Sequence, residues 1–239
     1  MANKLQLLLI PGLVSTRLMW ERQVDGLSDI ADCWVTPLPA FDSITAMTEE
    51  ILANAPDQFV LAGHSMGGYI CFEIMRQAPH RVAGLALFST SAEPESATLT
   101  ERRFEMMRDA ERYGYLSMIR TAAPKFVVGN DRGDVVVDMM VKQAFEVGQA
   151  AFCRHQMAAM KRVGYNEDVA HIACPALVLC GEKDIVTRPT VQRRMARAIP
   201  RASFHVVEQS AHMITMENAY QTNALMRDWL TGSDLAMAA

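Results

Sequence analysis

Short apolar runs alternate with longer segments of helix-like spacing along most of the chain. Most of these runs are almost continuously apolar, which is typical of strands that helices cover on both faces. They lie at residues 5–10, 33–35, 59–62, 82–89, 176–180 and 203–207, and the helical segments lie at about 17–28, 43–55, 67–77, 190–199 and 217–230. This alternation predicts an α/β fold in which helices cover a mostly parallel sheet of about six strands.

Residues 93–168 interrupt this alternation. They contain helical stretches, such as 99–112 and 134–147, and no convincing pair of strands. Because the segment lies between two predicted strands, we expect it to form a helical cap over the sheet edge where ligands bind. Residues 1–92 and 169–239 would then form the core of the protein.

Two kinds of side chain in this segment have more than one interpretation. Seven of the 17 methionines lie there, and ordinary helical packing explains them better than a flexible acyl pocket lined by methionine. Five arginines, at positions 102, 103, 108, 112 and 120, most simply form a solvated helix face. A docking surface for an acidic carrier protein is the alternative.

Composition and charge narrow the class of protein. Half of the 239 residues are apolar and 21% are charged, which is typical of a globular protein with a sizeable core. The formal net charge is −4, without a long run of one sign, which argues against nucleic acid as a partner. The apolar runs are far shorter than a bilayer span, so no membrane partner is expected.

The cysteines and the N-terminus indicate a compartment. The five cysteines are odd in number and widely spaced, with no C-x-x-C pair, so they predict reduced core residues and not disulfides or a zinc site. The first apolar run is too short for a signal peptide. We therefore expect a cytoplasmic protein without a metal or another cofactor. The small residues at 233–239 predict a frayed tail.

The strongest chemical signal is a G-x-S-x-G motif, Gly63-His64-Ser65-Met66-Gly67, between a predicted strand and a predicted helix. A serine on so tight a turn needs glycine two positions to either side, because a Cβ there would clash across the bend. The turn lifts the hydroxyl clear of the sheet and places it at a helix N-terminus, which favours negative charge. Ser65 is therefore a candidate nucleophile; the alternative is an idle serine on an ordinary turn.

A serine nucleophile needs a base, and the base needs a partner that fixes its tautomer. Asp184 follows the predicted strand at 176–180, and His212 follows the one at 203–207. The carboxyl ends of parallel strands meet at one edge, so these side chains can converge on Ser65 in the chain order Ser, Asp, His. Glu182 and Glu208 are the other candidate carboxylates.

An oxyanion site would complete this chemistry, since backbone N–H groups must bind the negative oxygen of a tetrahedral intermediate. Met66, directly after the candidate nucleophile, is one expected donor. Leu13, in the loop at 10–14 after the first strand, is the other, although that loop could be only a tight turn. His64 also lies beside Ser65, but we expect it to point elsewhere around the turn.

Four motifs together resemble the α/β-hydrolase family, in its small lidded branch. They are Leu-Leu-Ile-Pro-Gly, Gly-His-Ser-Met-Gly-Gly, Leu-Cys-Gly-Glu-Lys-Asp and Ser-Ala-His-Met, and the resemblance runs over nearly the whole chain. It implies that Ser65 is the nucleophile, His212 the general base and acid, and Asp184 its orienting partner, under a cap at about 93–168.

This resemblance has two departures. Many relatives carry His-Gly where this chain has Pro11-Gly12, which changes the side chains that line the oxyanion loop but leaves its backbone usable. The chain also begins at what is usually the third strand, so we expect six strands, all parallel.

We therefore expect a metal-free serine hydrolase that cleaves a small to medium carboxylic ester through an acyl-enzyme. The same triad could instead cleave a lactone, a thioester or a carbon–carbon bond, because the scaffold hosts many chemistries. Carbon–carbon hydrolases of this kind usually act on acidic substrates and would need a cation inside the pocket. A ligand-binding protein that keeps the fold without turnover is the alternative from a different class.

Overall fold

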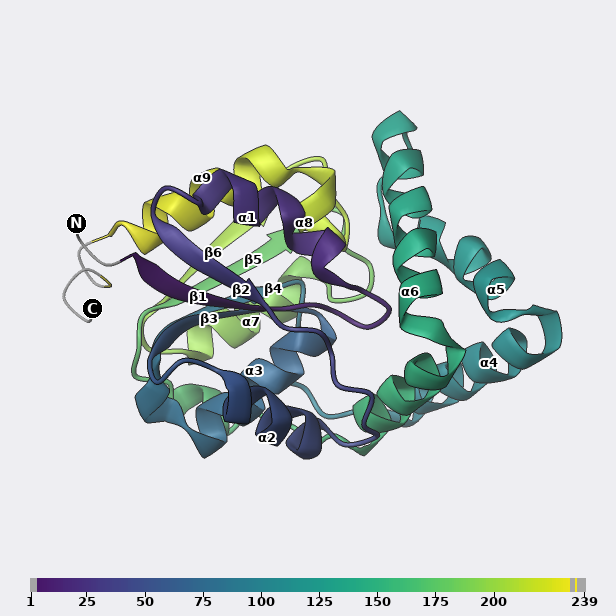
Figure 1. The fold of residues 1–239 in the computed structure, drawn as a ribbon, viewed down its shortest axis with the longest axis horizontal. Helices are drawn as coiled ribbons and strands as arrows, with labels where there is room; N and C mark the ends of the chain where they lie inside the picture. The colour runs from purple at the N-terminus through teal and green to yellow at the C-terminus, as the bar shows by residue number, and fades with distance from the viewer. Residues whose placement is uncertain (1–3, 233–234, 236–239) are drawn as a thin grey trace.

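The computed structural model describes residues 4–232 and 235 and contains a six-stranded parallel sheet covered by helices on both faces (Figure 1). The strand order is β2-β1-β3-β4-β5-β6, and every neighbouring pair is parallel. The strands are β1 (Leu5–Ile10), β2 (Ala31–Val35), β3 (Phe59–His64), β4 (Val82–Phe88), β5 (Ala176–Gly181) and β6 (Ala202–Val207). The predicted all-parallel sheet is confirmed. The tail at 233–239 lies, except for Leu235, outside the described residues.

Helices pack on the two faces of the sheet in separate apolar layers. Those of the core are α1 (Glu21–Leu27), α2 (Ile44–Asn54), α3 (Met66–Gln77), α7 (Pro189–Ala198), α8 (Ile214–Glu217) and α9 (Ala219–Leu230), with short 3-10 helices η1 (Arg17–Trp20) and η2 (Pro79–Arg81). Leu8 and Ile10 belong to the layer that contains α2, α3 and α7, whereas Leu7 and Leu9 belong to the layer with α1 and α9. Successive strand residues point to opposite faces, so a strand covered on both sides must be continuously apolar.

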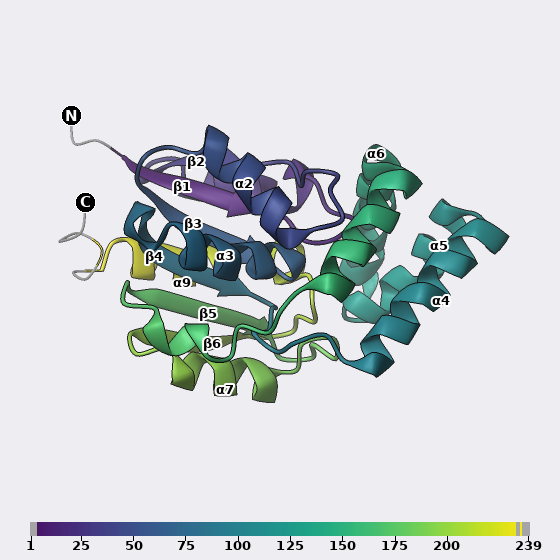
Figure 2. The ribbon, with the colours of Figure 1, turned by 90° about the horizontal axis from the view of Figure 1, so that it is seen from below.

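The segment between β4 and β5 is helical throughout its regular structure. It contains α4 (Ala97–Tyr113), α5 (Tyr115–Ala122), η3 (Ala123–Phe126), α6 (Asp131–Lys161) and η4 (Asp168–His171). Figures 1 and 2 show α4, α5 and α6 beyond the carboxyl ends of the strands. We call residues 93–168 the cap segment; its separation from the core as a domain stays a prediction.

Local sequence explains where the cap helices begin and bend. The Ser96 side chain accepts a hydrogen bond from the Leu99 amide, and the Asn130 side chain accepts one from the Gly133 amide, so each caps a helix N-terminus. Within α6, Gly148 has φ 76° and ψ 156°, a conformation that L side chains rarely adopt. Two helices therefore meet at an angle at this residue.

A cluster of buried charges within the cap segment contacts the core at Tyr69. Glu95 accepts hydrogen bonds from Arg103, at 2.7 Å, and from Arg162. The side chains of Glu95 and Arg162 are only 4% and 2% exposed, and the Arg162 guanidinium lies 4.2 Å from the centroid of the Tyr69 ring in α3. Arg103 also donates to Gln156 of α6 at 2.7 Å, and its side chain is 17% exposed. Arg103 is thus a partly buried, ion-paired residue, whereas the sequence predicted that it lies on a solvated helix face.

Replacing the shared carboxylate should strongly destabilise the protein. Glu95→Gln leaves two largely buried guanidinium groups without their counter-charge, and we expect the free energy of unfolding to fall by about 3–5 kcal/mol. Urea denaturation measures it.

Glu93→Gln is the matched control, because Glu93 pairs with the exposed side chain of Arg194. An exposed ion pair contributes less than about 1 kcal/mol. Equal losses in the two variants would contradict the anchoring role of Glu95.

Candidate active site

Ser65 lies between β3 and α3 in a backbone conformation that only external contacts can hold. Its φ is 51° and its ψ is −112°, a region that non-glycine residues rarely occupy. The Ser65 amide donates to the Phe88 carbonyl at 2.9 Å, and its carbonyl accepts from the Gly68 amide at 2.9 Å and from the Thr90 hydroxyl at 2.8 Å. Such strain persists where the surroundings over-determine it, and this is common at functional sites.

The two glycines of the motif leave no room for a side chain. A Cβ on Gly63 would lie 2.5 Å from the Gly67 carbonyl oxygen, and a Cβ on Gly67 would lie 2.4 Å from the Ile10 carbonyl oxygen. The first contact closes the bend, as the motif predicts. The second brings the loop after β1 against the start of α3.

That close approach places the predicted oxyanion loop beside Ser65. A Cβ on Gly12 would lie 3.4 Å from the Cβ of Ser65. The Leu13 and Met66 amides on either side of this contact donate no hydrogen bond to any residue that the structure describes. Neither amide is thus engaged within the described part of the chain, and their role as oxyanion donors stays a prediction.

Asp184 and His212 form a buried hydrogen-bonded pair at the carboxyl edge of the sheet. The His212 Nδ1–H donates to Asp184 Oδ2 at 3.0 Å. The other acceptor sites of Asp184 bind the Val186 amide at 2.8 Å and the amide and hydroxyl of Thr187 at 2.9 and 2.8 Å. This arrangement leaves the Nε2 of His212 with a lone pair that can take a proton. Both Glu182 and Glu208 are exposed.

The environment of Asp184 keeps it ionised. Burial would raise the pKa of its carboxyl, but the charge and hydrogen bond of His212 and the two hydrogen bonds from Thr187 hold the pKa below its usual value. A permanently charged carboxylate can stabilise an imidazolium when His212 is protonated.

The residue before Ser65, His64, contacts His212. No hydrogen bond joins the Ser65 hydroxyl to His212 within the described part of the chain, but the His64 ring centroid lies 4.9 Å from that of His212. Catalytic hydrogen bonds often tighten only when substrate binds. The complete triad stays a prediction.

His64 supports the site in a way that the sequence did not indicate. Its Nε2–H donates to the backbone carbonyl of His212 at 2.8 Å, and the side chain is buried beneath the His212 loop. Burial first, and then the nearby charge on His212, lowers the pKa of His64 to about 3. His64 is therefore a neutral side chain that supports the position of His212 through this hydrogen bond.

Glu217 is a second residue that the motifs missed. Its carboxylate accepts hydrogen bonds from the amides of Ala211 and Met213, which flank His212, at 3.0 and 3.1 Å. It also accepts one from the Val128 amide, in the cap segment, at 2.7 Å. Burial raises the pKa of Glu217, while these amides and the charge on His212 oppose the rise. One buried carboxylate therefore ties the His212 loop to the cap segment.

An apolar cluster of the cap segment lies against the oxyanion loop. Leu13 and Val14 pack with a group of side chains from α4, α5 and α6: Ala110, Tyr115, Met118, Ile119, Ala144 and Phe152, with Met106 and Met107 partly buried beside them. In contrast, Met139 and Met140 pack against the sheet core. The surroundings of the predicted oxyanion loop on the side of the cap segment are thus apolar.

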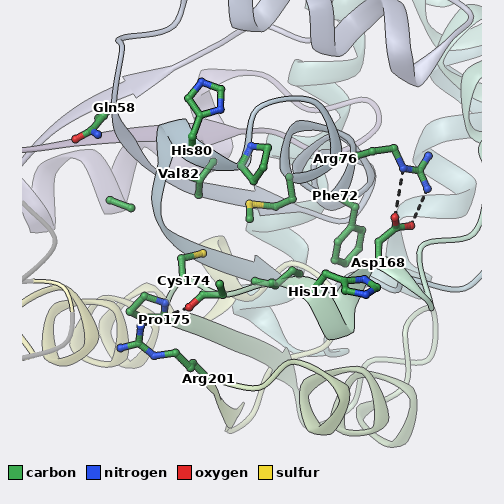
Figure 3. Close-up of a pocket in the computed structure, with 15 residues that line it drawn as sticks. Gln58, Phe72, Arg76, His80, Val82, Asp168, His171, Cys174, Pro175 and Arg201 are labelled. Atoms are coloured by element: carbon green, nitrogen blue, oxygen red, sulfur yellow. Dashed lines mark hydrogen bonds and ion pairs between the residues drawn. The ribbon is translucent and has the colours of Figure 1, made fainter.

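A cavity of about 580 Å³ lies at the amino ends of the strands, at the edge of the sheet opposite Asp184 and His212 (Figure 3). Its lining includes Gln58, Val82 and Pro175, at or just before the amino ends of β3, β4 and β5. An ion pair between Arg76 and Asp168, 2.7 Å long, also lines it. None of the predicted site residues lines this cavity, so it is separate from the candidate active site.

The described residues contain neither a metal-binding cluster nor a membrane-spanning helix. No group of three or more histidine, cysteine, aspartate or glutamate side chains in residues 4–232 could hold a metal ion. No helix of the same part of the chain is both long and apolar enough to cross a bilayer. All five cysteines are free thiols.

Comparison with known proteins gives the family. A family model described as serine aminopeptidase, S33, matches residues 39–219. The chain is 24% identical over 207 residues to a putative carbamate hydrolase RutD of Klebsiella pneumoniae, which covers 82% of this chain and 76% of that protein. It is 22% identical over 194 residues to a pimeloyl-[acyl-carrier protein] methyl ester esterase of Neisseria meningitidis, which covers 79% of this chain and 76% of that protein.

Solved structures agree with this match. A thermophilic esterase from Thermogutta terrifontis superposes with a TM-score of 0.86 at 25% identity, covering 95% of this chain and 90% of that chain. An enol-lactonase from Burkholderia xenovorans has the same fold, with a TM-score of 0.86 at 21% identity over 97% of this chain and 93% of that chain. The protein belongs to the serine aminopeptidase family of α/β-hydrolases and is a hydrolytic enzyme.

The free energy of unfolding should fall as the pH is lowered from about 6.5 toward 3, because His64 is held neutral when folded. In the unfolded chain the same imidazole takes up a proton below about pH 6.5. The unfolded state then binds more protons than the folded state, so stability increases with pH across this window. Urea denaturation at several pH values in the window measures the slope.

His64→Gln is the control for this pH dependence. Glutamine can still donate a hydrogen bond to the His212 carbonyl, but it does not titrate. The variant should therefore lose part of the slope. An identical pH dependence in the two proteins would show that His64 is not the responsible group.

Proposed function

We propose that the enzyme cleaves small to medium carboxylic esters through an acyl-enzyme formed on Ser65, with His212 as general base and acid and Asp184 as its orienting partner. The observation that carries this proposal is the buried Asp184–His212 hydrogen bond at the sheet edge where the strained Ser65 turn lies. A carboxylate-oriented imidazole beside a nucleophile is the arrangement that acyl transfer needs.

The reaction proceeds in two halves. The Ser65 oxygen attacks the ester carbonyl while His212 Nε2 takes the hydroxyl proton, and the resulting oxyanion accepts hydrogen bonds from the Leu13 and Met66 amides. His212 then gives this proton to the leaving alcohol as the bond from the carbonyl carbon to the alkoxy oxygen breaks. In the second half, His212 takes a proton from water, the hydroxide attacks the acyl-enzyme, and the proton returns to Ser65 as the acid leaves.

Three features favour a free small-molecule ester as the substrate. The comparison with an esterase at 25% identity supports ester cleavage. The apolar cluster against Leu13 and Val14 would hold an acyl chain. The largely buried Arg103 faces Glu95 and Gln156, so this guanidinium is already engaged and is less suited to an acidic substrate.

A carrier-bound ester is the second candidate, because the chain is similar to a pimeloyl-[acyl-carrier protein] methyl ester esterase. Its docking surface would use the cap arginines. Arg108 pairs with Glu101 at 2.7 Å, and Arg120 pairs with Asp138 at 2.9 Å, so neighbouring acids partly neutralise these two cations. This pairing favours the free ester. A cytoplasmic location stays a prediction from the cysteine pattern.

Ser65→Ala should lower kcat for ester hydrolysis by a factor of about 10⁴ or more, because it removes the nucleophile from a unit that acts cooperatively. The measurement uses p-nitrophenyl esters with acyl chains of about two to about twelve carbons, since the scaffold alone does not fix the chain length. The matched control is Ser117→Ala, an exposed serine of α5, which should keep full turnover.

The outcomes separate the competing functions. Comparable turnover in a folded Ser65→Ala protein would contradict the triad. Activity only toward a lactone, a thioester, a dicarbonyl compound, a carbamate, an aminoacyl amide or a carrier-bound methyl ester would replace the simple ester as substrate. Failure of a fluorophosphonate probe to label Ser65, together with no turnover, would favour a binding protein.

A further inference from the structure

A continuous chain of hydrogen bonds connects Ser65 to Asp184, and all of its bonds except the one from Thr90 to Ser65 are fully buried. The Thr90 hydroxyl donates to the Ser65 carbonyl at 2.8 Å, and the Thr90 amide donates to Gln192 Oε1 at 3.3 Å. The Gln192 amide group then donates to the carbonyl and the hydroxyl of Thr187, at 2.6 and 3.3 Å. Thr187 in turn donates its amide and hydroxyl to the two oxygens of Asp184.

Gln192 lies at the centre of this chain of hydrogen bonds and connects residues from three parts of the fold. Thr90 follows β4, Thr187 lies in the loop after β5, and Gln192 comes from α7, which covers one face of the sheet. The Gln192 side chain is 0% exposed. In such a low-dielectric setting, hydrogen bonds are strong and an unpaired polar group is costly.

The partners of Gln192 require a side chain that both accepts and donates. The Thr90 amide can only donate, so it must face the carbonyl oxygen of Gln192. The Thr187 carbonyl can only accept, so it must face the Gln192 NH₂ group. The orientation of the amide is therefore fixed by its surroundings, and a hydrophobic side chain of the same length would satisfy neither partner.

The chain of hydrogen bonds ends at Ser65 and at Asp184, whose positions depend on contacts with other residues. At one end, the positive φ of Ser65 depends on contacts such as the one from Thr90. At the other end, the Thr187 hydroxyl accepts from Gln192 and so directs its own hydrogen to Asp184 Oδ2, the oxygen that also binds His212. Loss of Gln192 would loosen both ends at once.

We propose that Gln192 is a positioning residue for hydrolysis, which fixes the Ser65 turn relative to the Asp184–His212 pair through Thr90 and Thr187. This role rests on the proposed triad. Gln192 does not contact the reacting atoms, and its effect is to hold the nucleophile and the base in register. Small displacements of positioned groups lower the rate of the chemical step more than they lower substrate binding.

The test is Gln192→Met, which keeps the length of the side chain and removes its donor and acceptor. We expect kcat to fall by about tenfold or more while KM stays within about twofold, with a parallel fall in the rate of fluorophosphonate labelling. The matched control is Tyr165→Phe, which loses a buried hydrogen bond to Glu73 away from the triad. This control should lose stability but keep kcat.

A double-mutant cycle with Thr187→Val distinguishes positioning from general destabilisation. If both residues act through one chain, the double variant should have a kcat close to that of the slower single variant. Should Gln192→Met fail to fold, Thr90→Val tests the same chain at the Ser65 end, and Thr90→Ser should restore kcat because it keeps the hydroxyl.

Each result has a defined meaning. A wild-type kcat in a folded Gln192→Met protein, or a kcat that falls only in proportion to the folded fraction, would overturn the role of Gln192 while leaving the triad intact. Equal kcat values for Thr90→Val and Thr90→Ser would also overturn the positioning role of Gln192. Full turnover in Ser65→Ala would instead contradict the triad itself.

Discussion

The close contact between two stretches of backbone at the Ser65 turn determines the arrangement of the rest of the site. Gly63 and Gly67 let the end of β3, the start of α3 and the loop after β1 approach so closely that no Cβ fits between them. This contact brings the loop after β1, at Gly12, against Ser65. The requirement is purely steric, so no change elsewhere in the chain can substitute for it.

The parallel sheet supplies the remaining components from distant parts of the sequence. Asp184 and His212 meet because β5 and β6 are neighbours whose carboxyl ends share one edge. Beneath them, the site is held by buried polar residues and not by the apolar core alone. His64 binds the backbone carbonyl of His212, and Glu217 binds the backbone amide of the preceding residue. Gln192 binds the backbone carbonyl of Thr187, which is a hydrogen-bond partner of Asp184.

The strands along the chain, and the candidate site residues that come after them, could be predicted because each depends on local signals. Ser65, Asp184 and His212 each lie within five residues of the end of a predicted strand, and a glycine pattern marks the turn at Ser65. The supporting residues have no such signal. His64 and His212 are 148 positions apart, and Gln192 lies next to two arginines in a segment that resembles a solvated helix. The partial burial of Arg103 has no local signal either, since it depends on Glu95 and on Gln156 of α6, which lie elsewhere along the cap segment.

The link between the His212 loop and the cap segment depends on main-chain atoms on the cap side. The His212 amide donates to the Phe126 carbonyl at 3.0 Å, and the Val128 amide donates to the Glu217 carboxylate. Neither bond depends on which side chain the cap segment carries at these two positions. The side chains at positions 126 and 128 can therefore change during evolution while the loop that carries His212, the proposed general base, keeps its place.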